Sequence, residues 1–194
     1  MNYWFLYLLT TGEIYTSPYL GNATEWTNIP AGCAVLGPFD SATASAIVKD
    51  VYTHPNYYSV QNGSLVAVAN LAQLQLQDAQ TAKIASLQQS FDNTFLNGFP
   101  SSATGTLITF GCAPLDMQNI GDELNSVNAG IATYPITWMA FDGVTAVSFT
   151  TAAQFKQLAQ DAYNFKWAQI SNLRTKITNT KAATTVTAVN AIVW

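Results

Sequence analysis

Residues 138–155 read WMAFDGVTAVSFTTAAQF, and this stretch predicts a β-hairpin followed immediately by a helix. Two apolar runs, 137–141 and 146–149, flank Asp142-Gly143, and glycine accepts the backbone angles that a tight hairpin turn requires. Thr150 or Thr151 then offers a side-chain oxygen that can cap the start of a helix. The stretch therefore places a small sheet and a helix next to each other along the chain.

Helical periodicity surrounds this hairpin. Apolar side chains recur every three or four residues in 115–131, and again from Phe155 to Ile177. Residues 69–95 contain neither Gly nor Pro and carry apolar side chains at mostly helical spacing, which predicts one long helix. A short final helix is predicted to start at Thr184 or Thr185 and to end at Trp194.

The first part of the chain has the pattern of short strands. Tyr3–Leu9 is aromatic and aliphatic and predicts a central strand, which continues after Thr11-Gly12 as a hairpin over residues 13–16. Residues 33–36 form another apolar run, and Gly37-Pro38 is expected to stop it. These signals predict a small antiparallel sheet.

One helix and one hairpin complete this first part. Apolar residues from Ala44 to Val51 follow helical spacing, with Asp40 or Ser41 as the expected cap and Pro55 as the stop. Asn62-Gly63 favours a tight turn between two further strands. The predicted fold class is α+β, with a small α+β domain (1–68), a connecting helix (69–97), and a mainly helical domain that includes a hairpin (98–194).

The composition is poor in charge. Asp, Glu, Lys and Arg make up 9% of the 194 residues, against about 25% in ordinary soluble domains. A weakly charged surface repels neighbouring molecules little, which favours permanent assembly with a partner, although biased host composition also fits. The net charge is −4 and no run of Lys or Arg occurs, so we expect no nucleic-acid partner.

Candidate catalytic and metal-binding residues are few. His54, the single histidine, precedes Pro55 and is read as the end of a helix rather than as a catalytic base. Asp116, Asp122 and Glu123 fit a solvated helix face better than a metal site. We therefore expect no enzymatic activity, no cofactor and no metal.

The two cysteines and the first residues carry little further information. Cys33 and Cys112 lie in different segments without metal-ligand spacing, and two free thiols are expected rather than a disulfide. Met1–Leu9 is apolar but too short to cross a membrane and lacks a basic leader. We expect a cytosolic product without a membrane span.

The second half of the chain resembles a C-terminal domain, of unassigned biochemical role, found in many bacteriophage tail-fibre assembly proteins. The resemblance covers about residues 90–194 and consists of short motifs, which are Trp138, Asp142-Gly143, Thr151-Ala152-Ala153-Gln154, Leu158, Ala162, Arg174-Thr175-Lys176-Ile177 and Trp194.

The beginning of the chain is similar to the N-terminal module of tail-fibre assembly chaperones. The matching motifs are Thr11-Gly12-Glu13-Ile14-Tyr15, Ile29-Pro30-Ala31-Gly32-Cys33 and Gln61-Asn62-Gly63. The resemblance implies a non-enzymatic phage protein that binds the trimeric tail fibre, either aiding its assembly or staying on it as an adaptor or cap. It implies residence in the host bacterial cytoplasm during assembly, or in the virion tail if the protein is retained.

Two other functions stay open. One is a permanent structural component of the fibre or baseplate, and the other is a carbohydrate-binding tip that contacts the host surface. Self-association through the 69–97 helix is a further possibility. Aromatic side chains are the candidate interface residues, although core packing explains many of them equally well. The candidates are Tyr3, Trp4, Tyr7, Tyr15, Trp26, Tyr58, Trp138, Trp167 and Trp194.

Overall fold

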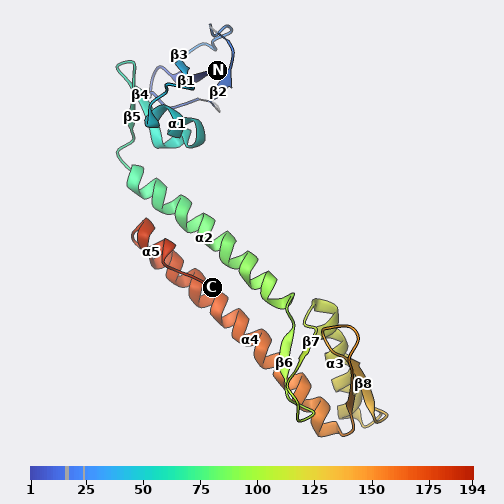
Figure 1. Cartoon of the computed structure of the whole chain (residues 1–194). Coiled ribbons are helices and arrows are strands. Elements are labelled where there is room, and N and C mark those ends of the chain that lie inside the picture. The colour runs from blue at the N-terminus through green and yellow to red at the C-terminus, as the bar shows by residue number, and fades with distance from the viewer. Residues whose placement is uncertain (16–17, 24) are drawn as a thin grey trace. The chain divides into compact units, whose positions relative to one another are not determined.

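The structure of the protein is a computed structural model, which describes residues 1–15, 18–23 and 25–194. Helices and small antiparallel sheets together confirm the predicted α+β class (Figure 1). The chain divides into two compact units, Met1–Asp78 and Ala79–Trp194, which we call the first and second units. The boundary falls inside the long helix that was expected to be a separate connecting segment.

A three-stranded sheet organises the first unit. Strand β1 (Asn2–Leu8) lies between β2 (Tyr19–Gly21) and β3 (Cys33–Asp40), and both neighbours are antiparallel to it. The first strand is therefore central, as predicted. Phe5 is fully buried where β1 packs against a helix of the same unit.

The predicted stop at Gly37-Pro38 is wrong, because β3 continues to Asp40. Phe5 pairs with Leu36 while Tyr3 pairs with Phe39, so two residues of β3 stand opposite one residue of β1. Such a bulge leaves part of the ladder unpaired, and it can therefore accommodate a proline, which lacks a backbone N–H.

The strand expected over residues 13–16 does not form in the described residues. Glu13 and Ile14 make only isolated bridges, to Ser59 and Tyr7, and Thr16 lies outside the described part of the chain. Strand β2 supplies the second neighbour of β1 instead. Because the pairing of β1 with β2 joins segments that are not adjacent in the sequence, no local sequence pattern predicts it.

Helix α1 (Ala46–Thr53) starts later than predicted. Ser45 is its N-cap and accepts a hydrogen bond from the backbone N–H of Val48 at 3.4 Å. The expected cap, Asp40 or Ser41, is therefore wrong, and the Asp40 carboxylate instead accepts a hydrogen bond from the backbone N–H of Ala42 in the preceding turn. A short 3₁₀ helix, η1 (Pro55–Tyr57), follows α1.

A hairpin completes the sheets of the first unit. Strands β4 (Tyr58–Gln61) and β5 (Ser64–Ala67) are antiparallel, and the turn between them is Asn62-Gly63. Both turn residues have positive φ, 50° and 74°, which confirms the predicted tight turn.

Two long helices run antiparallel in the second unit. Helix α2 (Leu71–Phe95) enters it at Ala79, and α4 (Ala152–Ala182) returns beside it (Figure 1). The Phe95 and Phe165 rings lie 5.9 Å apart at one end of the pair. At the other end, the Gln80 side-chain amide donates to the carbonyl oxygen of Lys181 at 3.3 Å.

Between these helices the chain forms two small hairpins and helix α3. The elements are β6 (Phe99–Ser101), β7 (Ile108–Phe110), α3 (Pro114–Ala129), β8 (Ile136–Met139) and β9 (Ala146–Phe149). The predicted hairpin around Asp142-Gly143 is confirmed, and Thr151 is the residue that caps α4. A core of aromatic and aliphatic side chains joins the hairpins, α3 and the first half of α4, with Phe149, Phe155 and Leu158 fully buried.

The last residues fold back along α2. Helix α5 (Val186–Asn190) buries Val189 completely. The Lys83 ammonium group on α2 donates to the carbonyl oxygens of Asn190 at 3.4 Å and Ile192 at 3.0 Å. A cation at this end of a helix opposes the partial negative charge of its free carbonyl groups, so Lys83 fastens α5 to α2.

Candidate interaction groove

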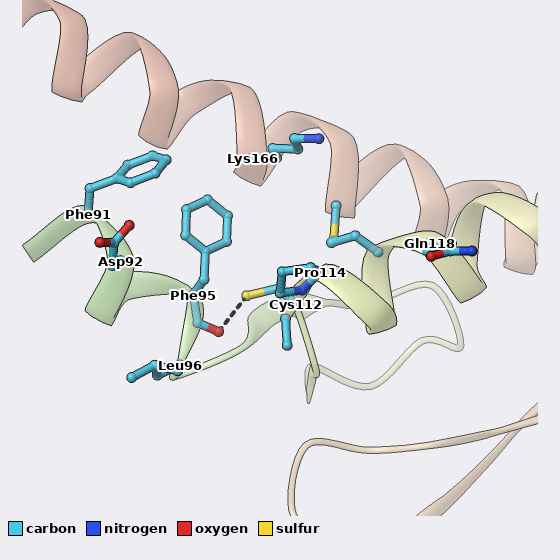
Figure 2. A pocket seen from close by; sticks show the side chains of 10 residues that line it. Phe91, Asp92, Phe95, Leu96, Cys112, Pro114, Gln118 and Lys166 are labelled. Atoms are coloured by element: carbon cyan, nitrogen blue, oxygen red, sulfur yellow. Dashed lines mark hydrogen bonds between the residues drawn. The ribbon is translucent and has the colours of Figure 1, made fainter. Parts of the chain in front are cut away.

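An open groove of about 640 Å³ lies in the second unit, where the end of α2 meets the start of α3 (Figure 2). We call it the α2–α3 groove. Its volume lies in the range of ligand pockets, which is roughly 300–1,000 Å³. It is lined by Phe91, Asp92, Phe95, Leu96, Cys112, Ala113, Pro114, Met117, Gln118 and Lys166.

The last turn of α2 supplies the apolar wall of the groove. Phe91 and Phe95 lie one turn apart and form an edge-to-face pair with ring centroids 4.9 Å apart. Both rings are half-buried, whereas Leu96, just beyond the helix end, keeps 67% of its surface exposed. Gly98 then reverses the chain at φ 72°, where an added Cβ would clash with the carbonyl oxygen of Phe110.

Cys112 forms the floor of the groove. Its Sγ–H donates to the carbonyl oxygen of Phe95 at 3.0 Å, and only 2% of the residue is exposed. Burial raises the pKa of the thiol to about 11, and the nearby Asp116 carboxylate acts in the same direction. At neutral pH Cys112 is therefore a packed thiol rather than a nucleophile. It is free, and so is Cys33, as expected.

The opposite wall of the groove belongs to α3. The Asp116 carboxylate accepts a hydrogen bond from the backbone N–H of Ala113 at 3.0 Å, which fixes the first turn of the helix. That turn places the half-buried Met117 in the groove. Asp92 and Lys166 stand on the rim without an ion pair between them in the described structure. The groove therefore combines an apolar wall with one charge of each sign.

His54 belongs to a separate polar cluster in the first unit. Its Nδ1 lies 2.9 Å from the Asp50 carboxylate and 3.0 Å from the Thr53 hydroxyl. A catalytic relay places the acid and the nucleophile on opposite nitrogens of the ring, whereas here both partners contact the same nitrogen. The cluster therefore lacks the geometry of a Ser-His-Asp type triad.

Two hydrogen bonds and one ring contact join this cluster to its neighbours in the fold. The Tyr58 hydroxyl donates to Asp50 at 2.6 Å, and the Tyr57 hydroxyl donates to Asp78 at 2.6 Å. The His54 ring stacks on Tyr57 with centroids 4.7 Å apart and an interplanar angle of 8°. These contacts tie α1, η1 and the start of α2 together within the first unit.

The described residues contain no group of three side chains arranged to hold a metal ion. Asp116, Asp122 and Glu123 do not form one, and Asp116 serves α3 as its N-terminal acceptor. Within the described ranges, no helix is both long and apolar enough to cross a membrane.

The candidate aromatics of the first unit occupy different environments. Trp4 is buried and donates its indole N–H to the carbonyl oxygen of Ala23 at 3.2 Å, so it serves the core. Trp26 is half-buried against Trp4, with centroids 6.4 Å apart. Tyr3, Tyr7 and Tyr58 are half-buried, and Tyr15 is exposed. Of this set, Tyr15 is the side chain most accessible to a partner.

The candidate tryptophans of the second unit also differ. Trp138 is half-buried against Phe155, with ring centroids 5.4 Å apart. Trp194 is half-buried against Phe91, with centroids 6.2 Å apart, and thereby supports one wall of the α2–α3 groove. Trp167 is exposed on α4. The structure does not gather the three tryptophans into one surface.

Sequence reasoning did not identify the residues of the groove. Phe91 and Phe95 were read only as part of a helical stripe, and Met117 only as part of the α3 core face. The remaining signal was Leu96, a large apolar residue directly after a predicted helix and before Gly98. The lining comes from segments that lie up to 75 residues apart, so no local pattern reveals it.

Helix α2 exposes little apolar surface for the expected self-association through residues 69–97. The exposed positions of this helix are Ala, Gln, Ser, Thr, Asn and Asp. Its single buried residue is Leu87, and its other large apolar side chains are half-buried. A second copy would therefore bury few apolar groups against α2.

Residues 78–193 match the model of the family described as a domain of unknown function, DUF4376. The match covers well over half of the chain, and the protein therefore belongs to this family. The matched range coincides with the second unit to within one residue at each end. No curated protein and no solved structure matches the chain significantly.

Proposed function

We propose that the protein is a non-enzymatic bacteriophage protein that binds the trimeric tail fibre, and that an apolar segment of the fibre docks in the α2–α3 groove. The observation that carries the proposal is the apolar wall of that groove. Phe91 and Phe95 are half-buried and Leu96 is largely exposed, beside only two charged side chains. Complete burial of the half-buried Phe91 and Phe95 rings stabilises a complex by roughly 1 kcal/mol each, because about half of the gain is already realised, and burial of the more exposed Leu96 stabilises it further.

A binding role of this kind needs no turnover. Fibres that trimerise through intertwined, non-local contacts expose apolar edges while they fold, and such edges aggregate. A partner that covers them in the host cytoplasm raises the yield of correctly assembled trimer. Asp92 and Lys166 on the rim of the groove offer polar contacts that orient the bound segment.

The test is co-expression of the fibre with the wild-type protein, with a Leu96→Asp variant, and alone. We expect the yield of soluble fibre trimer to fall when the protein is omitted and when Leu96 is changed. Equal yields in the three cultures would contradict an assembly role.

A permanent structural component of the virion tail is the second candidate, and the low charge of the chain favours it. With 9% charged residues the surface repels its neighbours weakly, which suits a protein that stays in a packed assembly. The amount of this protein in purified particles, measured by mass spectrometry, distinguishes a transient chaperone from a retained component. A fixed ratio of this protein to the fibre supports retention as adaptor or structural component, and its absence from particles leaves the transient chaperone.

A further inference from the structure

A second surface of the second unit runs along the outside of α4. Its residues follow one another at steps of three and four, which keeps them on one face of the helix. We call it the α4 outer stripe, and it consists of Lys156, Gln160, Tyr163, Trp167, Ile170, Arg174, Ile177 and Lys181. It spans roughly 38 Å of helix at 1.5 Å per residue.

The centre of the stripe is a ladder of exposed side chains. Tyr163 and Trp167 are 56% and 44% exposed, and their ring centroids lie 6.1 Å apart. The Arg174 guanidinium lies over the Trp167 ring, 6.0 Å from its centroid. Tyr, Trp and Arg are the residue types that most often dominate binding energy at protein interfaces.

This ladder is separate from the α2–α3 groove and from the core of the unit. The core side of α4 is formed by Phe155, Leu158 and Ala162, all of which are buried. The groove uses Lys166, which is not part of the stripe. The stripe and the groove therefore share no side chain.

The charge on α4 is opposite to that of the rest of the chain. The helix carries five of the seven Lys and Arg residues and only one of the eleven Asp and Glu residues, Asp161. The Asp161 carboxylate already accepts hydrogen bonds from Ser101 and Gln157, at 2.6 and 2.7 Å. Among the described residues, no cation of α4 forms an ion pair with a carboxylate.

A shallow hollow beside the first half of the stripe also carries a cation and lacks carboxylates. It is lined by Leu124 and Asn128 of α3 and by Lys156, Ala159, Gln160 and Tyr163 of α4, without a carboxylate. Two copies placed stripe to stripe would therefore bring cations against cations. A partner that supplies carboxylates avoids this repulsion and pairs with Arg174, Lys156 and Lys181.

The spacing of the stripe residues along α4 indicates which kind of partner structure fits this surface. Steps of three and four residues match the seam that one helix presents to another, and aromatic and aliphatic side chains occupy its middle. A single-stranded nucleic acid would also accept aromatic rings and cations, but it requires a groove with a denser run of Lys and Arg than three cations spread over 38 Å.

We propose that the α4 outer stripe is a docking surface for an acidic amphipathic helix of a partner protein, with Tyr163, Trp167 and Arg174 as its principal contacts. The proposal goes beyond the proposed function, because it states the chemistry of a partner at a surface that the groove does not use.

The test measures binding of a fluorescently labelled synthetic peptide to the full-length protein by anisotropy. The peptide is an amphipathic helix with a Leu and Ala face flanked by Glu, used at concentrations at which it is monomeric. A matched peptide has Lys at every Glu position. We expect the Glu peptide to bind at least about tenfold more tightly than the Lys peptide at low salt, with the difference shrinking as salt is added.

Variants assign the binding to the ladder. Arg174→Glu and Trp167→Ala should each weaken the Glu peptide by about tenfold or more, and both side chains are exposed, so the fold should persist by circular dichroism. The control is Lys49→Glu, on α1 of the first unit, which changes the net charge by the same amount as Arg174→Glu. It should leave the affinity for the Glu peptide unchanged.

Four outcomes overturn the proposal. The first is equal affinity for the Glu and Lys peptides, and the second is an Arg174→Glu variant that binds like the wild type. The third is a single-stranded DNA oligonucleotide of similar charge that binds more tightly than the Glu peptide. The fourth is self-association of the wild-type protein that Trp167→Ala abolishes, which would make a second copy the occupant of the stripe.

Discussion

The indole Nε1–H of Trp194 donates to the hydroxyl oxygen of Thr94 at 3.1 Å, which joins two residues a hundred positions apart. Trp194 also packs edge-to-face on Phe91, one of the residues that line the α2–α3 groove. Lys83 donates to the carbonyl groups of Asn190, the last residue of α5, and of Ile192, and together with the Trp194 contact it fixes the last residues of the chain against α2. The apolar wall of the groove therefore depends on residues far away in the sequence.

Replacing Trp194 tests this dependence. Trp194→Ala removes the contact with Phe91 and leaves the Thr94 hydroxyl without its donor, so the second unit should lose about 2 kcal/mol of unfolding free energy in urea. Val193→Ala, next to it and exposed, should change the unfolding free energy by less than about 0.5 kcal/mol. Equal stability of the two variants would show that the last residues do not support the unit.

Gly12 and Gly63 form a matched pair in the first unit. Both have positive φ, 73° and 74°, so alanine is strained at either position by about 1 kcal/mol. At Gly12 the added Cβ would also clash with the carbonyl oxygen of Val60, whereas at Gly63 it would meet no atom within 4 Å. Gly12→Ala should therefore be destabilising by at least about 2 kcal/mol more than Gly63→Ala in thermal unfolding. Similar melting temperatures for the two variants would show that the backbone at Gly12 does not approach the carbonyl oxygen of Val60 closely.

The Tyr58–Asp50 hydrogen bond predicts a bell-shaped pH dependence. Tyr58, and to a lesser extent His54, hold the pKa of the Asp50 carboxyl below its usual 3.8, so this stabilisation is present above about pH 4 and is lost as pH falls through the lowered pKa. The same hydrogen bond, with burial, raises the pKa of Tyr58 to about 12, so its stabilisation is present below pH 10 and is lost as pH rises toward 12.

Comparing Tyr58→Phe with the wild type measures this effect. The difference in unfolding free energy should be about 1 kcal/mol between pH 5 and 9, and it should narrow at both ends of the pH range. Tyr52→Phe, at an exposed ring in the same unit, is the control for loss of a tyrosine hydroxyl outside the Tyr58–Asp50 hydrogen bond, and it should change the unfolding free energy by less than about 0.5 kcal/mol. A Tyr58→Phe difference that is constant from pH 3 to 12 would contradict the assignment.

Cys112 should react slowly with thiol reagents. Its pKa of about 11 and its 2% exposure leave little accessible thiolate at pH 8. With Ellman's reagent we expect a slow phase for Cys112 in the native protein and two rapidly reacting thiols per chain in denaturant. Rapid modification of Cys112 in the native state would mean that the floor of the groove opens.

Local sequence signals predicted most of the elements but not the groove. The Asp142-Gly143 hairpin and the long helices depend on turn chemistry and periodicity within one segment, so they could be read directly. Strand β3 continues beyond Pro38 because a bulge forms where it pairs with β1. The sequence around Pro38 alone does not predict this bulge. The groove likewise requires Phe95 and Met117, on either side of a chain reversal, to line one surface. Of the ladder on α4, Trp167 was predicted as a candidate interface residue, but its contacts with Tyr163 and Arg174 were not predicted.

Capture of the tail fibre by the tagged protein in infected cells tests the central claim most directly. The three baits are the wild type, Leu96→Asp in the groove, and Leu107→Asp, an equally polar change at a residue of the same unit that is 73% exposed and does not line the groove. We predict that the wild type and Leu107→Asp retain the fibre and that Leu96→Asp loses most of it. Fibre retained equally by all three baits, or by none, would contradict fibre binding through the α2–α3 groove.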